Sequence, residues 1–181
     1  MRTKQKLSED FFGKVSNIYK KHGVNLQREV KSYIGGATVK AEFLSKEGKI
    51  VVKSSLEDVS KEIAHETAHA MEHIYGKVGK LNTRFYGGTS TGMGMSIKEF
   101  SEKSRKQIDS FTQEIIGREK EYIDESFRLY IEEPSEQFAN FVSEMILSPS
   151  ETERKYPDAV KEIKIKFKDV FDDMKRGFYL E

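Results

Sequence analysis

Apolar positions in the first part of the chain follow a helical spacing and then a strand-like one. Over residues 8–23 apolar side chains recur every three or four positions, with Ser8 at the N-cap and Gly23 just past the last turn. Residues 24–53 instead contain the β-rich runs VNLQREV, ATVKAEFL and KIVVK, separated by a Gly-Gly pair and the turn SKEG. We therefore expect a helix followed by a small sheet.

Helical spacing returns after the sheet and continues to the C-terminus. Ser55 and Asp58 form a capping box that opens a helix reaching about Tyr75. A Gly-rich segment, residues 76–96, follows, and loops of this length are often functional. The elements predicted beyond it are a helix capped by Ser96 and Glu99, a charged helical stretch from 118 to about 131, a helix from Pro134 that ends before Pro149, and a last helix from Pro157.

This order of elements predicts an α+β fold. With 181 residues, the chain is expected to form one domain, 1–181. Its N-terminal part, 1–76, would hold the sheet and the helix from Ser55, and its C-terminal part, 96–181, would be helical.

Composition narrows the classes of partner and of site. The 31 basic and 30 acidic residues give a net charge of +1, so neither nucleic acid nor a membrane surface is expected as a partner. No apolar segment is long enough to span a bilayer, and no apolar run follows the basic N-terminus as in a secretory signal. We therefore expect a cytoplasmic protein, and a monomer. Cysteine is absent, so any metal must be held by histidine and carboxylate side chains.

The helix predicted from Ser55 carries an H-E-x-x-H motif, HETAH, from His65 to His69. Positions i and i+4 project from one face of a helix, so His65 and His69 can bind one metal ion. Glu66 can then act as general base on the water that the ion activates. Zinc suits such ligands and keeps one position for water. The alternative is a solvated helix that carries two histidines by chance.

His73 continues the same spacing but is not expected to bind the same ion. Eight residues of helix span about 12 Å, whereas zinc–nitrogen bonds are about 2.0–2.1 Å long. We therefore expect His73 to pack or to lie at the rim of the site. His22 is expected to interact with carbonyl groups at the end of the first helix.

The third ligand must be a carboxylate, and none lies between Glu72 and Glu99. Glu136 opens a later helix with an apolar stripe. The small residues that share its face either form a solvent surface or let a second helix approach closely. The residue pattern leaves Glu136 as one of several candidates, the others being Glu114, Glu132, Glu133 and Glu144.

HETAHAMEH followed by EEPSEQFANFVSEMILSP resembles the zincin metallopeptidases grouped around the anthrax lethal factor catalytic domain and the bacterial Pro-Pro endopeptidases. In that group a zinc-binding glutamate lies in an E-[EF]-F-A-like motif on a later helix, and the letters EQFA from Glu136 match it. The resemblance covers about residues 34–175. It implies a zincin-like fold, with a small twisted sheet packed on the active-site helix and a helical C-terminal subdomain. It also implies one zinc ion per chain, held by His65, His69 and Glu136.

The resemblance further implies how a substrate binds. IGGATV, residues 34–39, is similar to the Gly-Gly-led edge strand of Pro-Pro endopeptidases, so a peptide is expected to lie along the strand near Gly36–Phe43. The group uses a tyrosine shortly before the glutamate ligand to stabilise the oxyanion. Tyr130 is the nearest match, although one residue closer than the pattern, with Tyr122 and Tyr86 as alternatives. A long insertion between the two motifs is a second departure, so the group's substrate preference is not transferred.

EQFANFVSEMILSP is also similar to the ImmA/IrrE family of zinc peptidases, regulatory proteases that cleave repressors. Both resemblances imply the same site and differ in substrate. We therefore expect a zinc-dependent endopeptidase with Glu66 as general base, and Tyr130 is the preferred oxyanion stabiliser. The competing class is a non-catalytic zinc-binding interaction module on the same fold. The intact Glu66 argues against that class, because a structural site does not need this carboxylate.

Overall fold

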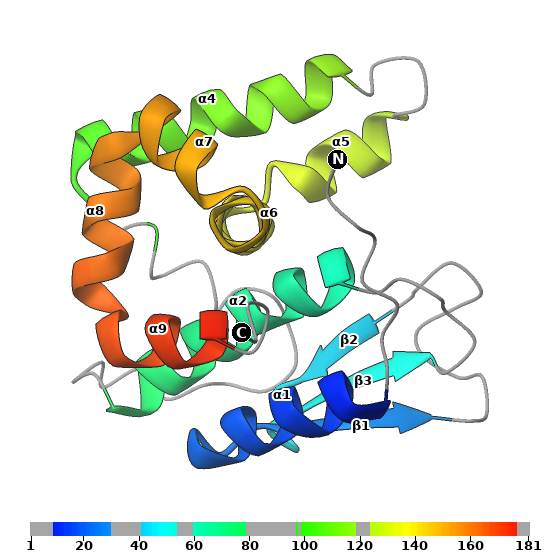
Figure 1. Cartoon of the computed structure of the whole chain (residues 1–181). Coiled ribbons are helices and arrows are strands. Elements are labelled where there is room, and N and C mark those ends of the chain that lie inside the picture. The colour runs from blue at the N-terminus through cyan, green and yellow to red at the C-terminus, as the bar shows by residue number, and fades with distance from the viewer. Residues whose placement is uncertain are drawn as a thin grey trace.

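The computed structural model describes residues 9–29, 41–53, 60–78, 97, 99–118 and 124–176, and their fold is α+β, as expected (Figure 1). Helices predominate, and a three-stranded sheet lies beside them. In chain order the elements are α1 (Glu9–Lys21), β1 (Asn25–Glu29), β2 (Ala41–Leu44), β3 (Lys49–Lys53), α2 (Ser60–Val78), α4 (Glu102–Arg118), α5 (Glu125–Ile131), α6 (Pro134–Leu147), α7 (Pro149–Lys155), α8 (Pro157–Lys166) and α9 (Lys168–Arg176).

The sheet is mixed, with the strand order β1-β3-β2. β1 runs parallel to β3, and β2 pairs with β3 as an antiparallel hairpin in which Phe43 lies opposite Ile50. The hairpin turn requires a glycine at Gly48, because φ is 60° there and a Cβ would lie 3.0 Å from the Gly23 carbonyl oxygen. The Asn25 N–H donates to the Gly48 carbonyl at 2.8 Å. This hydrogen bond ties the start of β1 to the hairpin.

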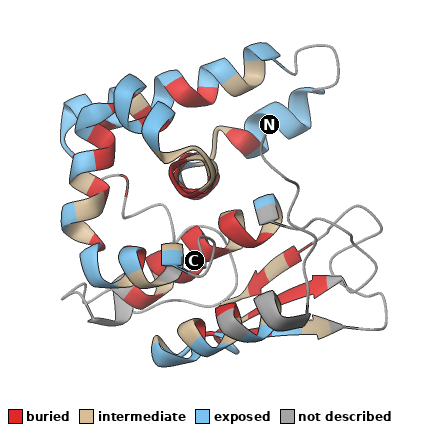
Figure 2. Cartoon of the chain, in the orientation of Figure 1, coloured by how far each residue is buried: buried red, intermediate tan, exposed pale blue. Residues whose placement is uncertain are grey.

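α2 lies between the sheet and α6, and it packs on both (Figure 1). α6 is buried around most of its circumference (Figure 2), including its small residues Ala139 and Ser143. The Ser143 hydroxyl donates to the Lys61 carbonyl of α2 at 3.4 Å. Of the two alternatives for this face of α6, a solvent surface or a second helix, the structure has the second. The close packing of α2 on α6 is what positions the candidate site.

Two predicted helix starts are wrong. α4 begins at Glu102, and the Ser101 hydroxyl accepts a hydrogen bond from the Ser104 N–H at 3.3 Å, so Ser96 and Glu99 do not cap this helix. The charged stretch after residue 118 is not one continuous helix. α5 has its own N-cap at residue 124, where the side chain accepts from the N–H three positions on. Residues 119–123 lie outside the described residues, as do the predicted cap at 55–58 and most of the Gly-rich segment.

The last predicted helix is two helices, α8 and α9, which meet at Phe167. Phe167 is buried and its ring centroid lies 5.3 Å from that of Phe138 on α6. The helical spacing of the segment does not reveal this break. α2 also runs past the predicted end, to Val78. None of the helices that the structure describes is both long and apolar enough to cross a membrane.

Candidate metal centre

The H-E-x-x-H motif lies on α2, and Glu136 lies in the first turn of α6. His65 Nε2 is 3.1 Å from Glu136 Oε2, and His69 Nε2 is 3.4 Å from Glu136 Oε1. Within the part of the chain that the structure describes, these three residues form a group that could hold a metal ion. One ligand atom from each lies within 4.8 Å of the others. The three predicted ligands are therefore brought together.

Local sequence explains this convergence. His65 and His69 stand one turn apart on α2, with their ring centroids 5.0 Å apart. Pro134 occupies the first helical position of α6, which places Glu136 in the first turn. Only 7% of the Glu136 surface is exposed. Because a buried carboxylate is costly unless it is paired, Glu136 depends on the two histidines or on a cation.

The donor set and its electrostatics fit a divalent cation. Two imidazole nitrogens and a carboxylate are ligands that zinc accepts, and three protein ligands leave a position for water or substrate. Burial opposes the charged form of Glu136, but the two histidines outweigh it and hold the pKa of Glu136 well below its usual range. Burial also opposes the charged form of His69, yet Glu136 and Glu72 raise the pKa of His69 to about 10. Zinc binding would displace this proton, because a histidine must be neutral to bind a metal.

Glu66 lies next to this cluster and is fixed from the opposite side by the sheet. Its Oε2 accepts a hydrogen bond from the Phe43 N–H of β2 at 2.7 Å. Burial raises the pKa of Glu66, and the nearby His69, His65 and Phe43 N–H only partly oppose this effect. An oriented carboxylate with an increased affinity for protons suits a general base.

Glu72 contacts His69 from inside the molecule. Its side chain is buried, and its Oε2 lies 3.6 Å from His69 Nδ1. The other nitrogen of the ring, Nε2, faces Glu136. A carboxylate beside Nδ1 favours the tautomer that leaves Nε2 free to bind a metal, and it increases the basicity of the ring. This role was not predicted from the sequence, although an acidic residue three positions after the second histidine could have indicated it.

We expect Glu72→Gln to weaken zinc binding by about 10- to 100-fold, because the amide keeps the shape of the side chain but loses its charge. The measurement is competition for zinc against a chelating indicator. Glu62→Gln, on the same helix but outside the ligand group, is the control and should retain the parent affinity. Equal affinities of Glu72→Gln and the parent protein would contradict this role.

A cavity of about 620 Å³ opens beside the cluster. His65, Glu66 and Glu136 line it, and so does Tyr130, the predicted oxyanion stabiliser. Tyr130 is half exposed and stacks on Phe127, with ring centroids 6.1 Å apart. Burial within the cavity and the Glu136 carboxylate raise the pKa of Tyr130 well above its usual range. The further lining residues are Ala41, Lys61, Glu62, Phe111, Ile115, Arg118, Phe127, Ile131, Asn140, Ser143 and Glu144.

The other candidates from the sequence lie in different surroundings. Of the five carboxylates considered as third ligand, all of which the structure describes, only Glu136 joins the two histidines. His73 packs against Phe43, with ring centroids 5.5 Å apart, as expected of a packing residue. The partner expected for the His22 side chain is wrong, because its Nε2 lies 3.1 Å from the Asp173 carboxylate of α9. The alternative tyrosines at 122 and 86, and residues 36–40 of the expected edge strand, lie outside the described residues.

No protein-family model, curated protein or solved structure matches this chain.

Proposed function

We propose that this chain is a zinc-dependent endopeptidase with a zincin-like active site. The observation that carries the proposal is the convergence of His65, His69 and Glu136 next to the Glu66 carboxylate, at the wall of a cavity. The volume of that cavity, about 620 Å³, is in the range of sites that bind small ligands and peptide segments. A structural zinc site has no need of an adjacent cavity, nor of an additional carboxylate aimed into it.

In the proposed reaction, His65, His69 and Glu136 hold the zinc ion. When bound, zinc polarises the scissile carbonyl and lowers the pKa of water. Glu66 accepts a proton from the attacking water and delivers it to the leaving amine. The raised pKa of Glu66 favours the first transfer, and its hydrogen bond from the Phe43 N–H keeps the carboxylate in place for both.

Tyr130 is the proposed donor to the oxyanion. It lines the same cavity as the metal ligands. A tyrosine hydroxyl is protonated at neutral pH, and the raised pKa of Tyr130 favours the same form, which can donate a hydrogen bond.

The substrate backbone is proposed to lie along β2, which is an edge strand among the strands that the structure describes. The Phe43 N–H donates to Glu66, so it points away from β3. Backbone groups two residues apart on a strand point to the same side, so those of Ala41 also point away from β3. Ala41 itself lines the cavity. An extended peptide can pair with them as an additional strand.

The test is incubation of the zinc-loaded protein with a library of capped peptides, followed by mass spectrometry. We expect internal cleavage that is lost on chelation and restored by added zinc. Cleavage that persists without metal, or no cleavage of any peptide by the zinc-loaded protein, would contradict the proposal. The same assay tests the proposed role of Tyr130 and the proposed pairing of the substrate along β2. An unchanged rate in Tyr130→Phe would exclude the tyrosine, and equal cleavage of backbone N-methylated peptides would exclude pairing along β2.

A further inference from the structure

The wall of the cavity that does not carry the metal ligands is built by α4 and α5. We propose that this wall, defined by Phe111, Ile115, Phe127 and Ile131 and called here the apolar wall, is a subsite for one large apolar side chain of a bound peptide. The proposal deepens the proposed function and rests on it for the identity of the ligand. Both helices lie between His69 and Glu136 in the sequence.

Burial within the apolar wall is graded from floor to rim. Phe111 and Ile131 are only 3% and 4% exposed and form the floor, Ile115 is half buried, and Phe127 is 46% exposed. An apolar side chain that enters the cavity would therefore meet a closed apolar surface below and an aromatic ring at the entrance. Such a site is concave and mostly apolar, as ligand sites generally are.

α5 adds an independent indication that something binds here. Three of its seven residues, Phe127, Leu129 and Tyr130, are large, apolar or aromatic, and at least 46% exposed. Phe127 and Tyr130 both line the cavity and stack on each other, whereas Leu129 does not line it. If the apolar wall were only the edge of the core, its rim would not need a stacked aromatic pair in contact with solvent. Exposed apolar surface of this kind is typical of ligand-binding sites.

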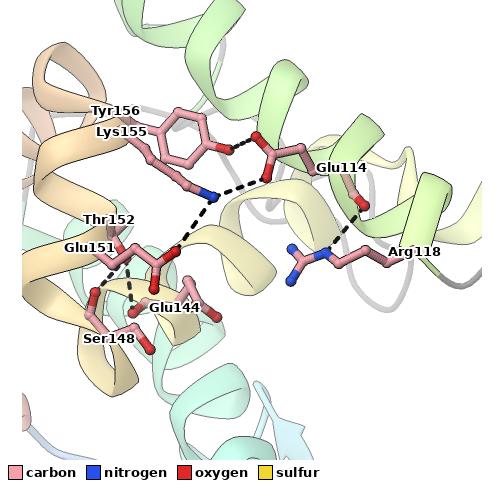
Figure 3. Close-up of polar contacts among 8 residues, drawn as sticks. All are labelled: Glu114, Arg118, Glu144, Ser148, Glu151, Thr152, Lys155 and Tyr156. Atoms are coloured by element: carbon pink, nitrogen blue, oxygen red, sulfur yellow. Dashed lines mark hydrogen bonds and ion pairs between the residues drawn. The ribbon is translucent and has the colours of Figure 1, made fainter.

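The apolar wall is held in position from behind. The Glu114 carboxylate, one residue from Ile115, accepts hydrogen bonds from the Tyr156 hydroxyl at 2.5 Å and from the Lys155 ammonium at 3.4 Å (Figure 3). The Arg118 Nε donates to the Glu114 carbonyl at 3.3 Å (Figure 3). The hydrogen bonds from Tyr156 and Lys155 fix the last turns of α4 to the junction of α7 and α8, and the Arg118 contact lies within α4. A subsite that is already ordered loses little conformational entropy when a ligand binds.

The aromatic core fixes the floor of the subsite as well. The Phe111 ring meets Phe141 and Tyr156 edge to face, with centroids 5.4 and 5.7 Å away. Phe111 therefore cannot easily turn aside, and the depth of the subsite is set by the core.

The charged side chains that line the cavity do not favour a charged ligand side chain over an apolar one. Apart from the metal cluster and the neighbouring Glu66, the charged side chains that line the cavity are Lys61 and Arg118, which are positive, and Glu62 and Glu144, which are negative. Two charges of each sign give the cavity little preference for a charged side chain. The free energy gained by removing an apolar side chain from water is then the main source of discrimination.

The direct test is peptide binding to the zinc-loaded Glu66→Gln protein, which should retain the ligand without cleaving it. The probes are two fluorescein-labelled octapeptides of glycine, alanine and serine with capped ends, one with a central phenylalanine and the other with serine in its place. We expect the phenylalanine peptide to bind about 10- to 100-fold more tightly. Equal binding of the two probes, or no binding of either, would overturn the proposal.

Two variants in the same background assign the effect to the apolar wall. Phe127→Ser should reduce the preference for phenylalanine by about 3- to 10-fold, because it removes the ring at the rim. Leu129→Ser is the matched control, since it removes a more exposed apolar side chain of the same helix, outside the cavity. If both variants reduce the preference equally, the apolar wall is not the subsite.

Binding and cleavage distinguish the two proposals. If the phenylalanine probe binds preferentially and the parent protein cleaves no peptide, the peptidase proposal fails and the subsite stands. If the parent protein cleaves peptides without regard to apolar side chains, the subsite fails and the peptidase proposal stands.

Discussion

Glu136→Gln is expected to reduce zinc affinity by more than about 100-fold. This loss is larger than the one expected for Glu72→Gln, because Glu136 is a ligand and Glu72 only contacts a ligand. The substitution preserves the size of a side chain that is 7% exposed, so the packing of α6 on α2 should be retained. What it removes is the negative charge of the carboxylate, whose oxygens lie 3.1 Å from His65 Nε2 and 3.4 Å from His69 Nε2. A neutral amide oxygen is a weaker ligand for zinc, and the other two ligands are neutral imidazoles.

Zinc content after dialysis and competition with a chelating indicator would measure this loss. Glu133→Gln is the matched control, since Glu133 is the neighbouring carboxylate that the sequence also allowed as third ligand. That variant should keep its zinc. If Glu136→Gln keeps zinc and Glu133→Gln loses it, the assignment of the third ligand is wrong. Circular dichroism of both metal-free proteins would show whether the helices are intact.

Glu66→Gln is expected to lower kcat by about 10²- to 10⁴-fold while zinc remains bound. Glutamine can still accept the hydrogen bond that the Phe43 N–H gives Glu66 at 2.7 Å, so the side chain should stay in place. It cannot accept the proton of the attacking water. The proposed mechanism therefore predicts a loss in kcat that is much larger than any change in zinc affinity or KM.

Steady-state kinetics on a peptide found in the library assay, together with zinc analysis of the same sample, would measure both quantities. Glu62→Gln changes a carboxylate that lines the same cavity one turn earlier on α2, and it should alter kcat by less than about tenfold. Full activity of zinc-loaded Glu66→Gln would contradict the role of general base. A comparable loss in Glu62→Gln would show that the cavity responds to any change of charge.

The helices and strands predicted correctly from the sequence are those in which the spacing of apolar residues matches the positions that are buried in the structure. α1 ends at Lys21, and Gly23 follows its end as expected, with a φ of 72° that favours a glycine. α6 starts at Pro134 and ends before Pro149, since both prolines act locally. Phe167 is the contrary example. Its segment has a helical spacing throughout, yet the helix breaks at Phe167, whose ring packs on Phe138 in the core.

The residues of the candidate site were likewise predicted only in part from the sequence. HETAH identifies two histidines and a glutamate through spacing along one helix. The second-motif resemblance then favoured Glu136 over other carboxylates, and the structure brings Glu136 alone among them to the histidines. Neither Glu72 behind His69 nor the hydrogen bond from Phe43 to Glu66 was predicted. The hydrogen bond from Phe43 joins the motif to β2, a strand outside it, and the contact of Glu72 with His69 depends on which face of α2 is buried.

By itself the sequence determined the α+β class, the motif on α2 and the kinds of side chain that could hold a metal. All three follow from short-range spacing, which sets the direction of side chains on a single element. Only the tertiary structure decided which carboxylate completes the group, what orients Glu66, and that α4 and α5 form a wall of the cavity. These are contacts between residues up to 71 positions apart, such as His65 and Glu136. They depend on how helices pack, and the small residues Ala139 and Ser143 permit that packing without specifying it.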